Sequence, residues 1–290
     1  MDTVSHFVEF PALGWHIDLS DTIVNFSLFG HDWSIRWYGA LIALGFLLAV
    51  IYGFRRAPKF GIDRDRLFDI VLVCTIVAFL GARLYYVLFS SSRDAYFANP
   101  LSILYLWEGG LAIYGGIIAG FLTTFFFCRA KKLSFPAMLD VISFGLLIGQ
   151  ILGRWGNFFN REAFGAETDI FCRMGLTAPD GSTIYVHPTF LYESLWNLAG
   201  LIFLILFSRK GKRRYDGQLI LIYFFRYGLG RFWIEGLRTD SLYIGSTGIR
   251  VSQLLSAVLV LVAGTILFLN RKEDTLHEIT QEIGDKQHGT

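Results

Sequence analysis

The sequence predicts an all-α integral membrane protein of about seven transmembrane helices, with its N-terminus outside and its C-terminus in the cytoplasm. Hydrophobic residues make up 53% of the 290 residues and charged residues only 17%, whereas a soluble domain carries about 25% charged residues. Seven apolar segments have the length of a membrane-spanning helix. Basic residues gather in alternate connections between these segments, which is typical of a multi-pass chain.

Each apolar segment is close to the ~20 residues that a helix needs to cross the hydrocarbon layer. The seven segments cover residues 35–54, 68–89, 111–128, 137–158, 189–207, 217–235 and 250–269. We therefore expect an extracytoplasmic N-terminal arm at residues 1–34 and a transmembrane domain at residues 35–270, which contains one long extracytoplasmic loop at residues 159–188. A cytoplasmic tail follows at residues 271–290.

The orientation follows from the distribution of Lys and Arg. Clusters of basic residues occupy the connections at residues 55–66, 129–132 and 209–214, and further basic residues lie in the tail. The first 35 residues contain no Lys or Arg, and the other connections contain few. Because cytoplasmic loops are enriched in basic residues, this pattern places the loop 159–188 on the outer face.

Several charged side chains fall within the apolar segments, where each costs roughly 2.5–3.5 kcal/mol and usually faces a bundle interior or a cavity. The fourth segment ends in GRWGNFFNREAFG (153–165) and carries a polar stripe at helical spacing, namely Gln150, Arg154, Asn157 and Arg161. The sixth segment carries a second stripe, namely Tyr227, Arg231, Glu235 and Arg238. We expect the two stripes to share one outward-facing polar site.

Two interpretations of these arginines are open. In one, they form internal ion pairs that hold helices together, such as Arg231 with Glu235 or Arg154 with Glu162. In the other, the arginines outnumber the carboxylates and bind an external anion, for which a lipid phosphate is the nearest source. The carboxylates counted for this comparison are Glu108, Glu162, Glu193 and Glu235. Arg226 lies near the middle of its segment, and we expect it to pair with a carboxylate or a carbonyl.

Three further motifs have ordinary structural explanations as well as functional ones. Tyr38 in RWYG fits an aromatic anchor at the membrane interface. The pair Gly115-Gly116 fits close packing between helices. His187-Pro188 fits the junction between a loop and the start of a helix.

Taken together in order and spacing, the motifs resemble the bacterial phosphatidylglycerol–prolipoprotein diacylglyceryl transferase family. The resemblance rests on RWYG (36–39), LGARLYYVLF (80–89), WEGGLAIYGG (107–116), GRWGNFFNREAFG (153–165), HPTFLYE (187–193) and RYGLGRFWIEGLRTD (226–240). It implies a seven-helix enzyme of the bacterial inner membrane whose active site faces outward. Such an enzyme moves the diacylglyceryl group of phosphatidylglycerol to the lipobox cysteine in the signal peptide of a preprolipoprotein. A thioether forms and glycerol phosphate leaves.

The resemblance also assigns site residues. It implies that Arg154 and Arg231 stabilise the leaving phosphate, as guanidinium groups aimed at developing charge do. The substrate-binding residues implied with them are Tyr38, Arg83, Tyr86, Gly115, Asn157, Asn160, Glu162, Gly165, His187, Tyr227, Glu235 and Arg238. The nucleophile belongs to the substrate, so none of the three native cysteines needs to react. No cofactor, metal or nucleic acid is implied.

The base that takes the thiol proton is open. Many members of the family have a histidine before the two glycines of the third segment, where this chain has Tyr114. A phenol, with a reference pKa of about 10, is a poor general base near neutral pH. Tyr114, His187 and Glu235 are the three candidates.

Two other classes of function compete with a transferase. A transporter would also place charges inside a helical bundle, but it more often shows inverted repeats and broken helices. An alcohol phosphotransferase acting on nucleotide-activated lipids would be expected to carry an Asp-rich motif on a helix. Here Asp69 and Asp140 stand singly at the starts of apolar segments, where helix capping explains them.

Overall fold

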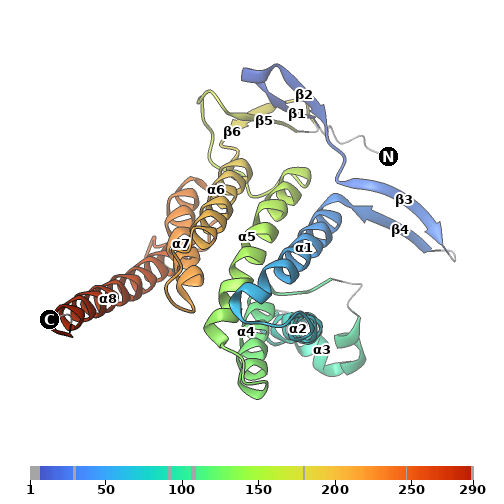
Figure 1. Ribbon diagram of the computed structural model, residues 1–290. Helices are drawn as coiled ribbons and strands as arrows, with labels where there is room; N and C mark the ends of the chain where they lie inside the picture. The colour runs from blue at the N-terminus through green and yellow to red at the C-terminus, as the bar shows by residue number, and fades with distance from the viewer. Residues whose placement is uncertain are drawn as a thin grey trace. The chain divides into compact units, whose positions relative to one another are not determined.

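The computed structural model describes residues 7–28, 31–90, 93–105, 109–178, 180–245 and 247–288 (Figure 1). Each of the seven apolar segments lies on a long helix. These helices are α1 (Trp37–Arg56), α2 (Arg64–Phe89), α4 (Ile113–Ala130), α5 (Phe135–Phe159), α6 (Thr189–Arg209), α7 (Gln218–Leu237) and α8 (Val251–His288). The short helix α3 (Arg93–Ala98) and three 3-10 turns, η1 (Pro11–Leu13), η2 (Ala57–Phe60) and η3 (Pro100–Leu104), lie in the arm and the connections.

Six of the long helices in the described part of the chain are long and apolar enough to cross a membrane. The chain is therefore a multi-pass helical membrane protein. The helix α7 is not among the six because it carries Arg226, Arg231 and Glu235 within 20 residues. The last helix is longer than expected, since α8 continues past its apolar part, which ends at Asn270.

The expectation of an all-α fold missed six short strands. The strands β1 (Phe7–Phe10), β2 (Trp15–Asp18), β5 (Met174–Thr177) and β6 (Thr183–Val186) form a sheet in the order β2-β1-β5-β6. The strands β3 (Thr22–Leu28) and β4 (His31–Arg36) form a separate hairpin. All six lie before α1 or in the loop between α5 and α6. Four-residue strands give almost no periodic signal, and the pairing of β1 with β5 joins segments that are far apart in sequence.

The four-stranded sheet has a small apolar core of its own. Its buried side chains pack together with residues from the end of α5 and the start of α6, namely Val8, Leu19, Phe158, Met174, Leu176, Val186 and Phe190. At the edge of the core, the hydroxyl of Tyr185 donates a hydrogen bond to Glu9, and this bond raises the pKa of Tyr185 above its ordinary value. The arm is thereby fixed to the loop that follows α5.

The chain divides into two compact units, Met1–Ala49 with Ser143–Thr290 and Val50–Ile142. In the first unit, α7 packs against both α6 and α8. In the second unit, α2 packs against α4. There the backbones approach so closely that a Cβ atom added at Gly115 would stand 2.3 Å from the carbonyl oxygen of Gly81. The interpretation of the Gly-Gly pair as a site of close helix packing is therefore confirmed at Gly115.

Candidate functional site

The predicted polar stripes of α5 and α7 meet through a third helix in the first unit. The carboxylate of Glu193 on α6 lies between two arginines. Its Oε2 atom is 2.5 Å from Nε of Arg154, and its Oε1 atom is 2.5 Å from Nη1 of Arg231. The expectation that the two arginine-bearing stripes converge is confirmed, and the residue that joins them is Glu193.

A second carboxylate completes this cluster. Nη2 of Arg231 lies 2.7 Å from Oε2 of Glu235, one helical turn further along α7. Both carboxylates are buried, with 5% of Glu193 and 2% of Glu235 exposed. The expected pair of Arg231 with Glu235 is thus present. Arg154, however, pairs with Glu193.

The cluster corrects the argument from an arginine surplus. Arg154 and Arg231 face Glu193 and Glu235, so two positive groups meet two negative ones. The excess of arginines over carboxylates that was counted along the sequence is therefore absent from this cluster. Glu193 contacts both arginines, and Glu235 contacts Arg231. Counting residues could not reveal this sharing, which depends on how three helices pack. Glu108, another of the counted carboxylates, lies outside the described residues.

From Arg154 the polar contacts continue into the GRWGNFFNREAFG motif. Nη1 of Arg154 donates to Oδ1 of Asn157 at 3.0 Å, and Nδ2 of Asn157 donates to Oε1 of Glu162 at 2.8 Å. Nδ2 of Asn160 also donates to Oε1 of Glu162, at 3.3 Å. One network of side chains therefore extends from the arginine cluster to the loop that follows α5.

The local backbone explains how Glu162 reaches this network. The helix α5 ends at Phe159, and Arg161 and Ala163 adopt left-handed backbone conformations with φ of 52° and 58°. This turn folds the chain back, so that the Glu162 N–H donates to the carbonyl of Asn157 at 3.0 Å. A helix that simply continued would carry Glu162 away from Asn157.

Gly165 lies where the backbones of three segments come together. Its N–H donates to the carbonyl of His187 at 3.0 Å, and it forms a β-bridge with Arg238. A Cβ atom at this position would stand 2.7 Å from the Cβ of His187 and 3.0 Å from the carbonyl oxygen of Leu237. Gly165 therefore allows these backbone segments to approach closely. Its partners are protein segments.

The start of α1 packs against the end of α5. A Cβ atom at Gly156 would stand 2.6 Å from the ring of Tyr38, and the ring of Trp37 stacks on Phe159 with centroids 4.7 Å apart. Tyr38 thus contacts the helix that carries Arg154. This position fits a wall of the site as well as an interfacial anchor.

The other predicted residues of this unit also have partners within the protein. Nε and Nη2 of Arg238 hold the two carboxylate oxygens of Asp240 at 2.9 and 2.6 Å, and this hydrogen bonding lowers the pKa of Asp240 below its ordinary value. Nδ1 of His187 lies 3.4 Å from the hydroxyl of Tyr192. The ring of Tyr227 stacks on Tyr223 with centroids 5.8 Å apart.

The remaining predicted residues lie in the second unit. Arg83 is buried, and all three of its guanidinium nitrogens donate to carbonyls of the chain that leads into α4. The accepting carbonyls belong to Ser102, Ile103, Tyr105, Gly109 and Gly110, at 2.6–3.3 Å. Arg83 therefore holds a connection in place. Tyr86 packs against Gly110, while Tyr114, near the start of α4, is about half exposed.

The chain is similar in sequence to proteins of one known family. A family model described as prolipoprotein diacylglyceryl transferase matches residues 24–269, a region that contains α1 to α7 and the whole polar network. The chain belongs to this family.

Individual relatives agree with the family model along almost their whole length. The phosphatidylglycerol–prolipoprotein diacylglyceryl transferase of Finegoldia magna is 43% identical over 254 residues, covering 87% of this chain and 97% of the relative. The enzyme of the same name from Clostridium novyi is 43% identical over 85% of this chain and 94% of its own. A third, from Streptococcus pneumoniae, is 43% identical over 86% and 95%.

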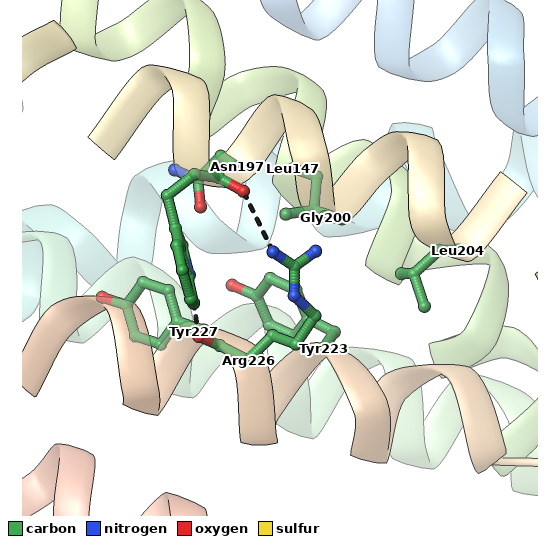
Figure 2. Close-up of a pocket in the computed structure, with 8 residues that line it drawn as sticks. Leu147, Asn197, Gly200, Leu204, Tyr223, Arg226 and Tyr227 are labelled. Carbon is green, nitrogen blue, oxygen red and sulfur yellow. Dashed lines mark hydrogen bonds between the residues drawn. The ribbon is translucent and has the colours of Figure 1, made fainter. Parts of the chain in front are cut away.

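In this member of the family, Arg226 has partners one to two turns away from the cluster, towards the start of α7. Its Nη2 atom lies 3.5 Å from the carbonyl oxygen of Trp196, and its guanidinium carbon lies 5.0 Å from the centroid of the Trp196 ring. The guanidinium points at Gly200 (Figure 2). Arg226 and Gly200 both line a cavity of about 10 Å³. The expectation that Arg226 pairs with a carbonyl or carboxylate is confirmed, with a carbonyl as the partner.

Sequence reasoning left two residues out of the site, Glu193 and Asp240. A signal for Glu193 was present, since it is a carboxylate inside an apolar segment, and such residues usually mark function. Asp240 gave no comparable signal because it lies in a polar loop beyond α7.

Proposed function

We propose that this protein transfers the diacylglyceryl group of phosphatidylglycerol to the lipobox cysteine of a preprolipoprotein. A sulfur–carbon bond forms as the bond between the lipid carbon and the phosphate oxygen breaks. The electron pair leaves with glycerol phosphate, and the thiol proton passes to a base. The observation that carries the proposal is the family match over residues 24–269, together with relatives named for this reaction at 43% identity.

The arginine cluster supports this chemistry. Two guanidinium groups from different helices share one carboxylate at 2.5 Å. A phosphate is also an anion with several oxygens, so it suits the same pair of donors. We place the leaving phosphate against Arg154 and Arg231, where fixed donors stabilise the charge that develops as the bond breaks.

In this proposal, Glu193 is a positioning residue. It holds Arg154 and Arg231 at a fixed separation when no lipid is bound. When phosphatidylglycerol enters, its phosphate competes with the carboxylate for the same N–H groups. Glu235 then balances part of the remaining charge through its 2.7 Å contact with Arg231.

The glycerol head group is assigned to the polar network beyond Arg154. The side chains of Asn157, Asn160 and Glu162 are already linked by hydrogen bonds, so they present a pre-arranged set of donors and acceptors. Tyr38 closes the side of this site through its contact with α5. The other substrate-binding assignments made from the sequence stay proposals, namely Tyr86, Gly115, Gly165, His187, Tyr227 and Arg238. For Arg83 we propose an indirect role, in which it fixes the connection before α4.

Tyr114 and His187 are the candidates for the base. Glu235 is less suited to the role, because its carboxylate is buried and already contacts the guanidinium of Arg231 at 2.7 Å. Tyr114 is half exposed at the start of α4 and can meet a substrate thiol. His187 lies just before α6, with its ring beside Tyr192 of that helix.

We further propose that α7 is the seventh span and that the active site faces the outer side of the bacterial inner membrane. The three charged residues that set α7 apart include two members of the cluster, and both point at protein partners. Such pairing lets a charged helix cross a bilayer inside a bundle. The arm 1–34, the transmembrane catalytic domain 35–270 and the tail 271–290 keep the roles expected from the sequence.

The decisive experiment is an assay of the purified full-length protein in detergent with phosphatidylglycerol and a synthetic lipobox peptide. Mass spectrometry of the peptide should show the gain of one diacylglyceryl group. A peptide with serine in place of the cysteine should gain nothing, and Arg154→Ala should abolish the gain. The proposal fails if wild-type protein with demonstrated binding of phosphatidylglycerol leaves the cysteine peptide unmodified.

A further inference from the structure

The hairpin formed by β3 and β4 has two chemically different faces. Its register pairs Phe26 with Trp33 and Val24 with Ile35, while the intervening pair is Asn25 with Ser34. Because successive side chains on a strand point to opposite faces, the first two pairs share one face. That face is apolar, and the paired residues of the opposite face are polar. Ile23 lies at the register shift between Thr22 and Val24, outside these pairs.

The apolar face has little cover from the described part of the protein. Val24, Phe26, Trp33 and Ile35 are each between 41% and 54% exposed. In contrast, the neighbouring four-stranded sheet buries Val8 completely in its core. A two-stranded hairpin alone is marginally stable in water and needs an apolar partner for its face.

The position of the hairpin indicates which partner this is. The strand β4 ends at Arg36, and α1 begins at the next residue, Trp37, whose N–H donates to the carbonyl of Asp21 at 3.0 Å. The hairpin therefore projects from the first turn of a membrane-spanning helix (Figure 1). The helix α1 itself carries exposed apolar side chains, such as Ile42 and Phe46.

We propose that the β3–β4 hairpin lies on the membrane, with Val24, Phe26, Trp33 and Ile35 in the boundary between head groups and acyl chains. Tryptophan is enriched at that depth, since its ring is apolar and its N–H needs a polar partner. Asn25, Ser27, Asp32 and Ser34 face the water. The open backbone groups at the edges of the hairpin meet water and head groups at this level, so they need no partner within the protein. This proposal does not depend on the enzymatic activity.

The test uses nitroxide spin labels on the full-length protein in phosphatidylglycerol-containing vesicles. Single cysteines are introduced as Phe26→Cys and Trp33→Cys on the apolar face, and as Asn25→Cys and Ser34→Cys on the polar face. The background carries Cys74→Ala, Cys128→Ala and Cys172→Ala. Labels on the apolar face should collide more with oxygen than with a water-soluble nickel complex. Labels on the polar face should show the reverse ratio.

Two results would overturn the proposal. Preferential collision with the nickel complex at all four positions would place the whole hairpin in water. Protection of positions 26 and 33 from both reagents would show that protein covers the face, as in contact with a second copy of this chain or a bound peptide. A second measurement avoids labels. The fluorescence lost in Trp33→Phe, compared with wild type, should be quenched more by lipids brominated near the head group than near the chain end.

Discussion

At the scale of single residues, Glu193 connects the parts of the site. It is the one carboxylate that touches both Arg154 and Arg231 in the described part of the chain, and it belongs to a helix that lies between theirs in sequence. A buried carboxylate held by two guanidinium groups is stable only while its partners are present. The carboxylate oxygens of Glu193 therefore stabilise the protein when no lipid is bound. In our proposal, they also compete with the lipid phosphate for the two arginines.

Glu193→Gln tests this competition. We expect a loss of roughly 3–5 kcal/mol in unfolding free energy, because two guanidinium groups lose their shared partner. We also expect phosphatidylglycerol to stabilise the variant more than wild type, because the competing anion is gone. Thermal unfolding in detergent with and without the lipid measures both effects. Glu9→Gln, in the four-stranded sheet, is the matched control and should not change the effect of lipid.

Arg154→Lys tests whether the planar guanidinium matters as well as its charge. The lysine keeps the positive charge but cannot donate to Glu193 and Asn157 from a rigid fork. We expect kcat to fall by about 10²–10³-fold, the cost typical of losing an oriented donor. Arg129→Lys, at the far end of α4, should retain wild-type turnover. Full activity of Arg154→Lys would show that charge alone is sufficient.

Tyr114→Phe tests the base. If the phenol takes the thiol proton, removing the hydroxyl should lower kcat by about 10²–10⁴-fold without changing the affinity for phosphatidylglycerol. Turnover and lipid binding are measured separately. Tyr85→Phe is the matched control, since the Tyr85 ring lies 6.4 Å from that of Tyr114. An active Tyr114→Phe enzyme would pass the role to His187.

At this scale, the sequence could predict contacts between residues that are close in sequence, but not contacts between residues on different helices. The pair of Arg231 with Glu235 is four residues apart on one helix, so spacing alone predicts it. The contacts of Glu193 depend on the packing of three helices, which no local pattern encodes. Arg83 illustrates the same limit. Its sequence position favours an anion site, yet the carbonyls that it holds belong to a connection whose path is set only by the fold.

At the scale of elements, helices were predictable and strands were not. A run of about 20 apolar residues has few structures open to it in a bilayer, because every backbone group must be paired within the segment. The sequence therefore predicts each long helix to within a few residues at most ends. The six strands are short and depend on partners elsewhere in the chain, so no sequence pattern indicated that these parts of the arm and the loop form strands.

The crossing of α2 and α4 supplies a prediction for an element. Gly115→Ala should destabilise the protein by about 1–3 kcal/mol, because the added methyl group meets the backbone of Gly81 and α2 must move. Gly120→Ala on the same helix is the matched control, since nothing lies within 4 Å of its added Cβ. It should be neutral or slightly stabilising. Thermal unfolding of the two variants distinguishes these outcomes. Equal stability would mean that the close approach carries no energy.

At the scale of the whole molecule, the membrane topology determines which connections between helices face the outer side of the membrane. The distribution of basic residues predicts that the loop after α5 is outside and the α6–α7 connection is inside. The exposed native Cys172 lies in that loop and is a natural reporter. We expect a membrane-impermeant maleimide to label it in intact spheroplasts, and Cys172→Ser to abolish the labelling.

Two further cysteines test whether α7 crosses the membrane. In the Cys172→Ser background, Leu242→Cys lies beyond the end of α7 and should react in intact spheroplasts. Lys212→Cys lies before its start and should react only after the membrane is permeabilised. Reaction of both positions from the same side would show that α7 does not span, and would contradict the proposed topology.

The pairing of β1 with β5 also has a consequence in time. Val8 is made early, but its partner Leu176 emerges only after α1 to α5 have been synthesised. At roughly 5–20 residues per second, the ribosome needs many seconds to supply that partner. During this interval one edge of β1 has no strand beside it, and the apolar core under the sheet is incomplete. The loop that follows α5 therefore supplies both Glu162, which joins the polar network, and the strand that pairs with the open edge of β1.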